Sequence, residues 1–343
     1  MIGVAVVGYG YWGPNLVRNV REVDGARVTH VVDRREDRRA EAAVRHPDVA
    51  VVADFATVLD DPDVHAVIVA TPVSSHYPLA LAALQAGRHV LIEKPIAASA
   101  AEARHLVAEA ESRGLTLLVD HTFVYTGAVR KMRELVEAGE LGELYYFDST
   151  RVNLGLFQSD VNVMWDLAVH DLSILGFVTG EEPVAVSAMA MSNIDGQPEN
   201  IAYLTLLFES SLVAHINVNW LAPLKVRRTL LSGSRRMVVF DDVVPGEPLK
   251  VYDRGVDLVV DNADRYDLLV NYRSGDVWSP RIDPSEALKV EMSHFVGCIR
   301  GEEAPITGGA AGVAVVDILE AATESARRKG SLVELSRTGA LLG

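Results

Sequence analysis

Two short groups of polar residues in this 343-residue chain have the composition of a catalytic site. The first is Glu93-Lys94-Pro95, which follows the apolar run 90–92. A lysine at the end of a buried strand can hydrogen-bond a substrate oxygen and stabilise the negative charge that develops there during hydride transfer. Pro95 fixes the turn, and we expect the Lys94–Pro95 peptide bond to be cis. The alternative is an ordinary surface lysine in a loop.

The second group contains Asp166 and His170, four residues apart in a segment that is expected to be helical. On a helix this spacing puts both side chains on one face. A carboxylate one turn from an imidazole orients the ring, so His170 is suited to remove a hydroxyl proton near neutral pH. A surface ion pair or a core histidine is the alternative. We predict no metal site, because His170 has no second histidine at useful spacing and hydride transfer to nicotinamide needs no metal.

A glycine-rich turn lies between the first apolar strand, 2–7, and a helical segment, 14–23. Its sequence is Gly8-Tyr9-Gly10-Tyr11-Trp12-Gly13. In such a turn the three glycines allow a tight bend, a close approach of the backbone to a pyrophosphate, and close packing of helix on strand. The helix N-terminus offers free N–H groups to the phosphates. The strand before and the helix after support a dinucleotide site.

Asp33 ends the second predicted strand, 26–32, twenty residues after Gly13. A carboxylate at this point accepts the adenosine-ribose hydroxyls and repels a 2′-phosphate, which favours NAD over NADP. Arg34 and Arg35 favour the opposite choice if either pairs with that phosphate. Their alternative role is to begin a solvated helix over 34–45.

The first part of the chain alternates short apolar strands with helices, which predicts a doubly wound parallel sheet. Further strands are expected at 50–53, 66–70, 90–92 and 115–119, and further helices at 55–59, 76–86 and 100–113. Because right-handed crossovers bring the carboxyl ends of parallel strands to one edge, the polar residues there should line one cleft. Its predicted cofactor-binding residues include Gly10, Gly13, Arg34, Pro72 and His121.

From residue 123 the pattern changes to period-2 strands without intervening helices, which predicts a mainly antiparallel sheet. We therefore divide the chain into a nucleotide-binding domain, 1–122, and a second domain, 123–343. The strands are expected at 144–152, 184–191, 201–208, 212–218 and 228–232. Helices are expected at 127–138, 166–175, 287–300 and 309–329, and residues 241–283 are expected to be an irregular surface excursion.

Composition limits the partners and the compartment. The formal net charge of −15 argues against binding to nucleic acid or to an anionic membrane surface. No apolar run has the length needed to span a bilayer, and a strand that begins at residue 2 leaves no room for a secretion signal. The single cysteine, Cys298, excludes an intrachain disulfide and is expected to be a buried thiol. These features favour the cytoplasm.

Together, the glycine turn, Asp33, Thr71-Pro72 with His76, Glu93-Lys94-Pro95 and the 166–170 segment resemble the family of glucose–fructose oxidoreductase, inositol dehydrogenase and the rhizopine-catabolism proteins (Gfo/Idh/MocA). The resemblance implies a Rossmann domain followed by an α/β domain whose open sheet mediates homodimers or homotetramers. It also implies that Lys94 and His170 are the catalytic pair, with Asp166 as a catalytic or substrate-positioning acid. Residues implied to line the cofactor are Gly8, Tyr11, Trp12, Asp33, Thr71, His76, Glu93 and Lys94.

A finer resemblance lies in 8–15 and 121–175, which are similar to the branch that acts on nucleotide-linked or amino sugars, commonly by oxidising a ring hydroxyl at C3. It implies a sugar pocket that includes Tyr125, Arg151, Asn153, Phe157 and Gln158, besides Asp166 and His170. Core packing is the alternative role for Tyr125 and Phe157. A nucleotide sugar and an aminoglycoside precursor both stay open, and the acidic surface favours a cationic or neutral sugar slightly.

The sequence thus predicts an NAD-dependent dehydrogenase that oxidises a secondary ring hydroxyl of a sugar. The expected roles are proton removal by His170 and stabilisation of the oxygen by Lys94. A cyclitol dehydrogenase and a regulator that binds NAD without chemistry are the alternatives. The regulator has no use for Lys94 together with His170.

Overall fold

The computed structural model describes residues 1–155, 161–244, 246–259 and 269–336 and contains two compact units. Among the described residues, unit 1 consists of Met1–Thr126 with Ser285–Glu320, and unit 2 consists of Gly127–Pro284 with 321–336. The chain first passes from unit 1 to unit 2 after Thr126, close to the predicted boundary after residue 122. The return of 285–320 to unit 1 differs from the sequence-based division, which assigned the whole C-terminal part to one domain.

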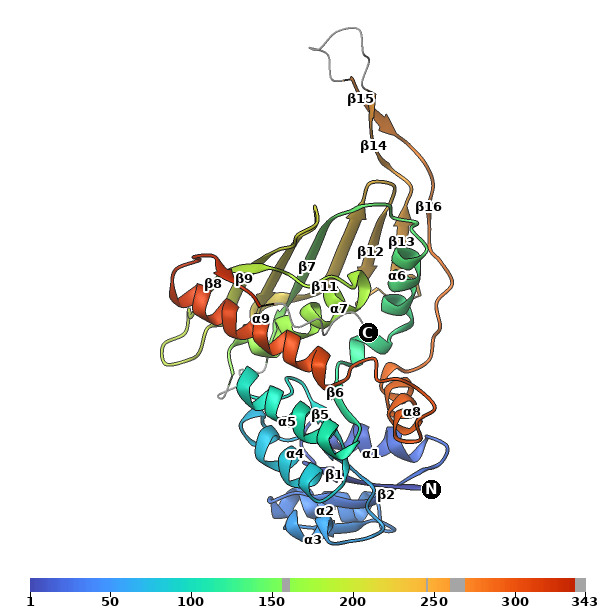
Figure 1. Ribbon diagram of the computed structural model, residues 1–343, viewed down its shortest axis with the longest axis vertical. Coiled ribbons are helices and arrows are strands. Elements are labelled where there is room, and N and C mark those ends of the chain that lie inside the picture. Colours follow the sequence, from blue (N-terminus) through green and yellow to red (C-terminus); the bar gives the residue numbers. More distant parts are fainter. Residues whose placement is uncertain (156–160, 245, 260–268, 337–343) are drawn as a thin grey trace. The chain divides into compact units, whose positions relative to one another are not determined.

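Unit 1 contains a six-stranded sheet in the order β3-β2-β1-β4-β5-β6, and all its neighbouring strands are parallel (Figure 1). This confirms the doubly wound parallel sheet. Its strands are β1 (Ile2–Val7), β2 (Ala26–Val32), β3 (Ala50–Val52), β4 (Ala66–Val69), β5 (His89–Glu93) and β6 (Leu117–Asp120). Its helices before residue 126 are α1 (Gly13–Arg21), α2 (Glu36–Arg45), α3 (Ala56–Leu59), α4 (His76–Gln85) and α5 (Ala100–Arg113), with short 3₁₀ turns η1 (Val73–Ser75) and η2 (Thr122–Tyr125).

Local sequence accounts for these elements. The central strands are continuous runs of valine, isoleucine and leucine, as expected for strands that are covered on both faces. Pro14 is the second residue of α1, and its missing N–H costs nothing in this first turn. Helix α5 begins where the Ser99 hydroxyl accepts a hydrogen bond from the Glu102 N–H, and it ends at Gly114 in the left-handed conformation.

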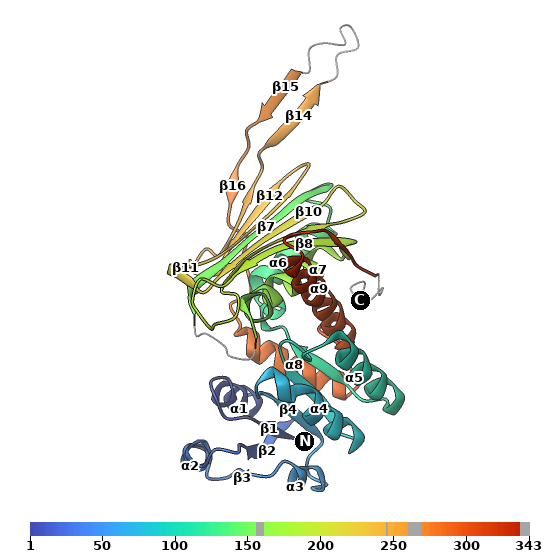
Figure 2. The ribbon, with the colours of Figure 1, turned by 90° about the vertical axis from the view of Figure 1, so that its left-hand side faces the viewer.

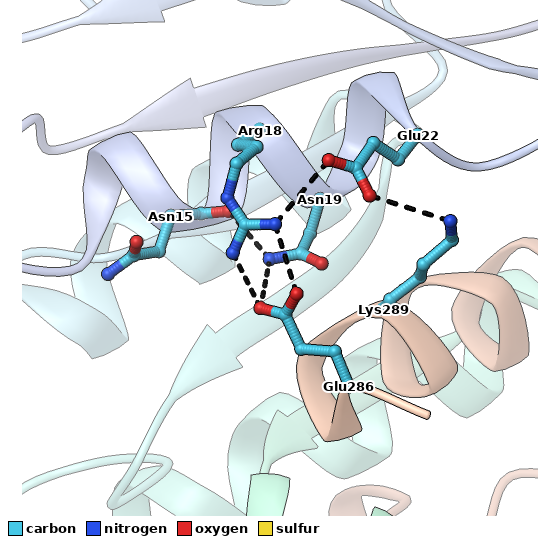
Figure 3. Close-up of polar contacts among 6 residues, drawn as sticks. All are labelled: Asn15, Arg18, Asn19, Glu22, Glu286 and Lys289. Atoms are coloured by element: carbon cyan, nitrogen blue, oxygen red, sulfur yellow. Dashed lines mark hydrogen bonds and ion pairs between the residues drawn. The ribbon is translucent and has the colours of Figure 1, made fainter. Parts of the chain in front are cut away.

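Helix α8 (Ala287–Ile299) and the first part of α9 (Gly309–Arg327) complete unit 1. Figure 3 shows how α8 is joined to α1 by polar side chains. Arg18 donates to both carboxylate oxygens of Glu286, at 3.0 and 2.5 Å, and Asn19 donates to the same residue at 3.2 Å. Lys289 pairs with Glu22 at 3.4 Å. Beneath these contacts, Leu288, Met292 and Phe295 are buried in the same core as β1 and β2.

Unit 2 contains a nine-stranded sheet in the order β16-β13-β12-β11-β7-β10-β9-β8-β17 (Figures 1 and 2). Only the β7–β10 pair is parallel, so the prediction of a mainly antiparallel sheet is confirmed. Helices α6 (Gly127–Glu137) and α7 (Val169–Thr179) cover one face of it (Figure 2). The strands are β7 (Leu144–Leu154), β8 (Ala185–Met191), β9 (Ile201–Leu207), β10 (Val213–Asn219), β11 (Leu221–Gly233), β12 (Met237–Asp241), β13 (Leu249–Tyr252), β16 (Val277–Trp278) and β17 (Val333–Glu334).

The expectation that residues 241–283 are irregular is wrong. This segment contains β13 and β16, which extend the sheet beyond β12, and the separate pair β14 (Gly255–Val259) and β15 (Leu269–Arg273). These strands are two to five residues long and lie among aspartates and prolines, which hides their period-2 pattern. In the described part of the chain, no helix is both long and apolar enough to cross a membrane.

Candidate active site

A cavity of roughly 570 Å³ in unit 1 lies at the carboxyl ends of β1, β2 and β4. Its lining includes Gly8, Gly10, Asp33, Arg34, Thr71 and Pro72. All six were predicted to lie along a dinucleotide, and the structure brings them together. In open α/β sheets, ligands bind at this edge, where neighbouring crossovers leave the sheet in opposite directions.

The glycine turn has the geometry that a dinucleotide requires. Gly8 has a φ of +100°, and a Cβ there would lie 2.3 Å from the Ala70 carbonyl oxygen. At Gly13 a Cβ would lie 2.4 Å from the Gly8 carbonyl oxygen, so α1 can pack on the turn only with glycine at this position. Gly10 lines the cavity, and a Cβ at this position would meet no described protein atom within 4 Å. These residues therefore fit NAD, with the pyrophosphate at the N-terminus of α1.

Asp33 is held by two backbone N–H groups. Its Oδ2 accepts from Tyr9 N at 2.8 Å and its Oδ1 accepts from Arg35 N at 2.8 Å. These bonds fix the carboxylate at the tip of β2, where each oxygen retains a lone pair for a ribose hydroxyl. The Arg35 guanidinium, by contrast, pairs with Asp37 at 2.5 Å. Arg34 is exposed on the rim of the cavity.

Two aromatic residues of the turn extend into solvent. Tyr11 is 76% exposed and Trp12 is 45% exposed, and their rings meet edge to face with centroids 5.4 Å apart. Neither residue belongs to the lining of the cavity. Their assignment to the cofactor stays a prediction.

His76 joins two loops of the site. Its ring is buried, with Nδ1 2.8 Å from the Pro95 carbonyl oxygen and Nε2 2.7 Å from the Thr71 carbonyl oxygen. The ring thus connects the loop after β4 with the loop after β5. These contacts position Thr71 and the Lys94–Pro95 turn, and the assignment of His76 to the cofactor stays a prediction. The predicted cis peptide bond at Lys94–Pro95 is confirmed.

Lys94 follows directly on β5 and is half-buried, and a cluster of buried carboxyl groups lies next to it. Glu93 and Asp120 are register partners on β5 and β6, and Glu291 of α8 is fully buried. Burial, together with the charge of Asp120, raises the pKa of Glu93 well above its usual range, while Lys94 acts in the opposite direction. Burial and Asp120 likewise raise the pKa of Glu291. Glu291 is missing from the sequence-based prediction, because no local pattern in α8 marks it.

His121 lies one residue beyond β6 and is 1% exposed. Burial and the charge of Lys94 lower the pKa of its ring to about 3. His121 is therefore neutral at physiological pH. Among the described residues, neither of its ring nitrogens has a hydrogen-bond partner, and its assignment to the cofactor stays a prediction.

Tyr125 is only 2% exposed, and its hydroxyl lies 2.9 Å from the Thr307 hydroxyl within unit 1. Its ring is tilted against that of His294, with centroids 5.6 Å apart. These contacts favour core packing, the alternative that the sequence left open for this residue. Cys298 is buried on the same helix as His294, as expected.

In unit 2, Asp166 lies in the π-helical turn η3 (Met164–Ala168), and His170 is the second residue of α7. The prediction of one regular helix over 166–175 is wrong for 166–168, which belong to the π-helical turn. The Val169 N–H reaches the Met164 carbonyl five residues earlier, so the turn contains an extra residue and the simple i,i+4 geometry does not apply. Such turns inside helices frequently occur at functional sites.

A buried ion pair fixes the start of α7. Arg151 on β7 donates to both oxygens of Asp171, at 2.9 and 3.1 Å, and Ser149 donates to Oδ1 at 2.7 Å. Arg151 is 3% exposed and Asp171 is 1% exposed. Arg151 thus has a structural partner that the sequence did not reveal, and its role toward a sugar stays a prediction. Asn153 lies on the same strand, whereas Phe157 and Gln158 lie outside the described residues.

Comparisons with known proteins agree with this geometry. Residues 2–121 match the NAD-binding Rossmann fold of an oxidoreductase family, and residues 129–239 match its GFO/IDH/MocA C-terminal domain. The chain is 29% identical to UDP-N-acetylglucosamine 3-dehydrogenase of Acidithiobacillus ferrooxidans over 252 residues, 73% of this chain and 75% of that protein.

Two further relatives align over nearly the whole chain. It is 24% identical to 2,7-anhydro-N-acetylneuraminate hydratase of Mediterraneibacter gnavus in an alignment of 379 positions, gaps included, that covers 99% of each protein. The structure of GenD2 from gentamicin A biosynthesis in complex with NAD superposes with a TM-score of 0.81 at 25% identity, covering 98% of this chain and 97% of that one. The chain belongs to the GFO/IDH/MocA oxidoreductase family, and it is an NAD-binding oxidoreductase.

Proposed function

We propose that this enzyme oxidises a secondary ring hydroxyl of a sugar, at C3, by hydride transfer to NAD. The observation that supports this most is the position of Lys94, which directly follows a strand of the sheet whose other carboxyl ends form the Asp33 cavity. A cation at that edge stabilises the oxygen that becomes negative as its carbon loses hydride.

Two sets of residues take part in the reaction: one binds NAD and the other acts on the substrate hydroxyl. Gly8, Gly10 and Asp33 hold NAD, which accepts the hydride. His170 removes the proton of the substrate hydroxyl, and Lys94 stabilises the oxygen left behind. The His121 ring supports this arrangement, because a neutral imidazole with a lowered pKa adds no second positive charge beside Lys94.

The relatives support an amino sugar as the substrate class. The name of the Acidithiobacillus ferrooxidans relative denotes 3-dehydrogenation of a nucleotide-linked amino sugar, and GenD2 comes from gentamicin A biosynthesis. We therefore propose an amino sugar, either free in an aminoglycoside precursor or linked to a nucleotide. A cytoplasmic site of action fits a chain with one buried cysteine.

Formation of NADH, followed by absorbance, tests the proposal. The panel contains UDP-N-acetylglucosamine, glucosamine and myo-inositol, which represent a nucleotide-linked sugar, an amino sugar and a cyclitol. We expect turnover with one of the first two and a loss of about two or more powers of ten in kcat for Lys94→Ala and for His170→Ala. Lys289→Ala and His105→Ala, which change the same residue types outside the site, serve as controls. Wild-type turnover in the Lys94 and His170 variants would refute the mechanism.

We also propose that the enzyme is a homodimer or homotetramer joined through the nine-stranded sheet of unit 2. Along β8, β9 and β10, apolar side chains at paired positions are exposed on the face opposite the buried residues. They include Met189 beside Tyr203 and Leu207 beside Val213. Apolar residues clustered on a sheet are typical of an interface. Light scattering after gel filtration should give twice or four times the 37.2 kDa chain mass, and Tyr203→Asp should lower it.

A further inference from the structure

Trp220 is a buried residue of unit 2 that the mechanism above does not use. It lies between β10 and β11, is 0% exposed, and is the largest of the fully buried side chains in the described structure. An indole N–H can only donate, so a buried tryptophan needs an acceptor. Here the acceptor is Asp166 Oδ2, at 3.0 Å from Trp220 Nε1.

The backbone on both sides of this tryptophan is fixed. Trp220 N donates to the Asn200 carbonyl at 2.9 Å, and the Trp220 carbonyl accepts from Gly155 N at 3.0 Å. Gly155 also packs directly on the indole. A Cβ at this position would lie 2.5 Å from Trp220 Cδ1, which is the ring carbon bonded to Nε1. A methyl group there would therefore displace the edge of the ring that carries the donor.

The π-helical turn that carries Asp166 is held independently at its backbone. The Asn162 carbonyl accepts from Asp166 N at 3.1 Å, and Asn162 Oδ1 accepts from Met164 N at 3.1 Å. On the neighbouring residue, Trp165 Nε1 donates to the Thr323 hydroxyl at 3.0 Å. Two indole N–H groups thus hold this turn. Trp220 donates to Asp166, whereas Trp165, the residue before Asp166, donates to Thr323.

We propose that Trp220 is the positioning residue of Asp166, and that Gly155 provides the space that this role needs. The inference rests on the proposed function, with Asp166 in the catalytic or substrate-positioning role that the family resemblance implies. The indole N–H fixes one carboxylate oxygen and stabilises its negative charge, which sets the direction in which the other oxygen points. A misplacement of about 1 Å at a catalytic group can lower a rate about a hundred-fold.

Three variants test this role in the NADH assay, on the panel member that is turned over. Trp220→Phe keeps an aromatic ring but removes the N–H, and we expect kcat to fall about 10- to 100-fold. Gly155→Ala should lower kcat in the same direction. Trp165→Phe is the matched control, because it removes an indole N–H from the same turn without touching Asp166, and it should keep wild-type kcat.

A double-mutant comparison separates positioning from general damage. If Trp220 acts through Asp166, then Trp220→Phe should have no further effect on kcat in an Asp166→Asn background. An undiminished further loss would show that Trp220 is merely structural and would overturn the inference. If Asp166→Asn alone keeps wild-type kcat, the role proposed for Asp166 fails.

A measurement on the intact protein tests the contact without turnover. The chain has four tryptophans, so an ¹H–¹⁵N spectrum contains four indole N–H signals at most, and Trp220→Phe or Gly155→Ala assigns the one of Trp220. Asp166→Asn should shift that signal and leave the Trp165 signal in place. An unmoved Trp220 signal would refute the hydrogen bond, and with it the inference, whatever the substrate.

Discussion

The cofactor cavity of unit 1 and the Asp166 region of unit 2 are built in different ways. In unit 1, Gly8, Asp33 and Lys94 each directly follow a strand of a parallel sheet, so chain geometry alone brings these strand ends to one edge. In unit 2, Asp166 is fixed by a contact with Trp220, between β10 and β11, and α7 is fixed by a contact with Arg151 on β7. A site at the strand ends of a repeating βα pattern can therefore be predicted from local sequence. In a mixed sheet, the residues that support a site come from distant segments and cannot be predicted in this way.

The largest effect should come from the buried ion pair of unit 2. Removing one partner of such a pair leaves an uncompensated charge in the interior. We expect Arg151→Met to lower the free energy of unfolding by about 3–5 kcal/mol, measured by urea denaturation. Lys250→Met, which also removes one positive charge but from an exposed pair with Glu247, is the control.

Arg151 also decides between two interpretations. If it mainly contacts the sugar, as the family resemblance implies, Arg151→Met should raise KM and leave the urea midpoint unchanged. That outcome would contradict the structural role and would weaken the contrast between the two units.

The second prediction concerns Asp33. Hydrogen bonds to a charged group contribute about 1.5–3 kcal/mol, so Asp33→Ser should weaken NADH binding about 10- to 100-fold. NADPH binding should fall less, because the carboxylate that repels a 2′-phosphate is lost as well. Fluorescence titrations with both nucleotides measure the two dissociation constants. Asp48→Ser, in a surface pair with Arg21, should change neither.

An equal loss for both nucleotides would indicate a different role for Asp33. Its carboxylate would then serve mainly to hold the backbone of Tyr9 and Arg35, and nucleotide choice would depend on other residues.

The sequence predicted the parts of this molecule that obey short-range rules. The glycine turn, the strand-end position of Asp33 and the placement of Lys94 follow from hydrophobic runs and fixed spacings. Helix ends such as Ser99 and Gly114 belong to the same class. The two sheets were predicted correctly because they too follow from hydrophobic runs and their spacing.

The remainder depends on contacts between distant segments. Nothing near Glu291 indicates that α8 would bring it beside Asp120, and nothing near Trp220 indicates a bond to a residue 54 positions earlier. The π-helical turn at Met164–Ala168 has the hydrophobic pattern of an ordinary helix, so its extra residue is invisible in the sequence. The strands in 241–283 are too short to show a period.

The third prediction uses the buried carboxyl groups of unit 1. The raised pKa values of Glu93 and Glu291 mean that the folded state keeps protons that the unfolded state loses above about pH 4.5. Their contribution to stability is therefore fully present at lower pH and declines as pH rises. Glu291→Gln, which cannot ionise, should raise the free energy of unfolding at pH 8 by about 1–3 kcal/mol and flatten its decline.

Glu286, which immediately precedes α8, gives the matched control with the opposite sign. The Arg18 side chain lowers the pKa of Glu286. Its contribution is therefore present above the unfolded pKa and is lost as pH falls, so Glu286→Gln should reduce stability at pH 8. Urea denaturation between pH 5 and 9 compares the two variants. The same sign for both would mean that Glu291 is ionised in the folded enzyme.

The smallest effect should come from the contacts that join α1 to α8. Arg18 and Glu286 are separated by 268 positions in the sequence and form two hydrogen bonds, yet their side chains are 45% and 46% exposed. Exposed pairs contribute only about 0.2–1 kcal/mol, and salt screens them. Arg18→Ala should therefore lower the free energy of unfolding by no more than that, and by less still in 1 M NaCl. A loss comparable to that of Arg151→Met would mean that distance along the chain, rather than burial, decides which contacts support each unit.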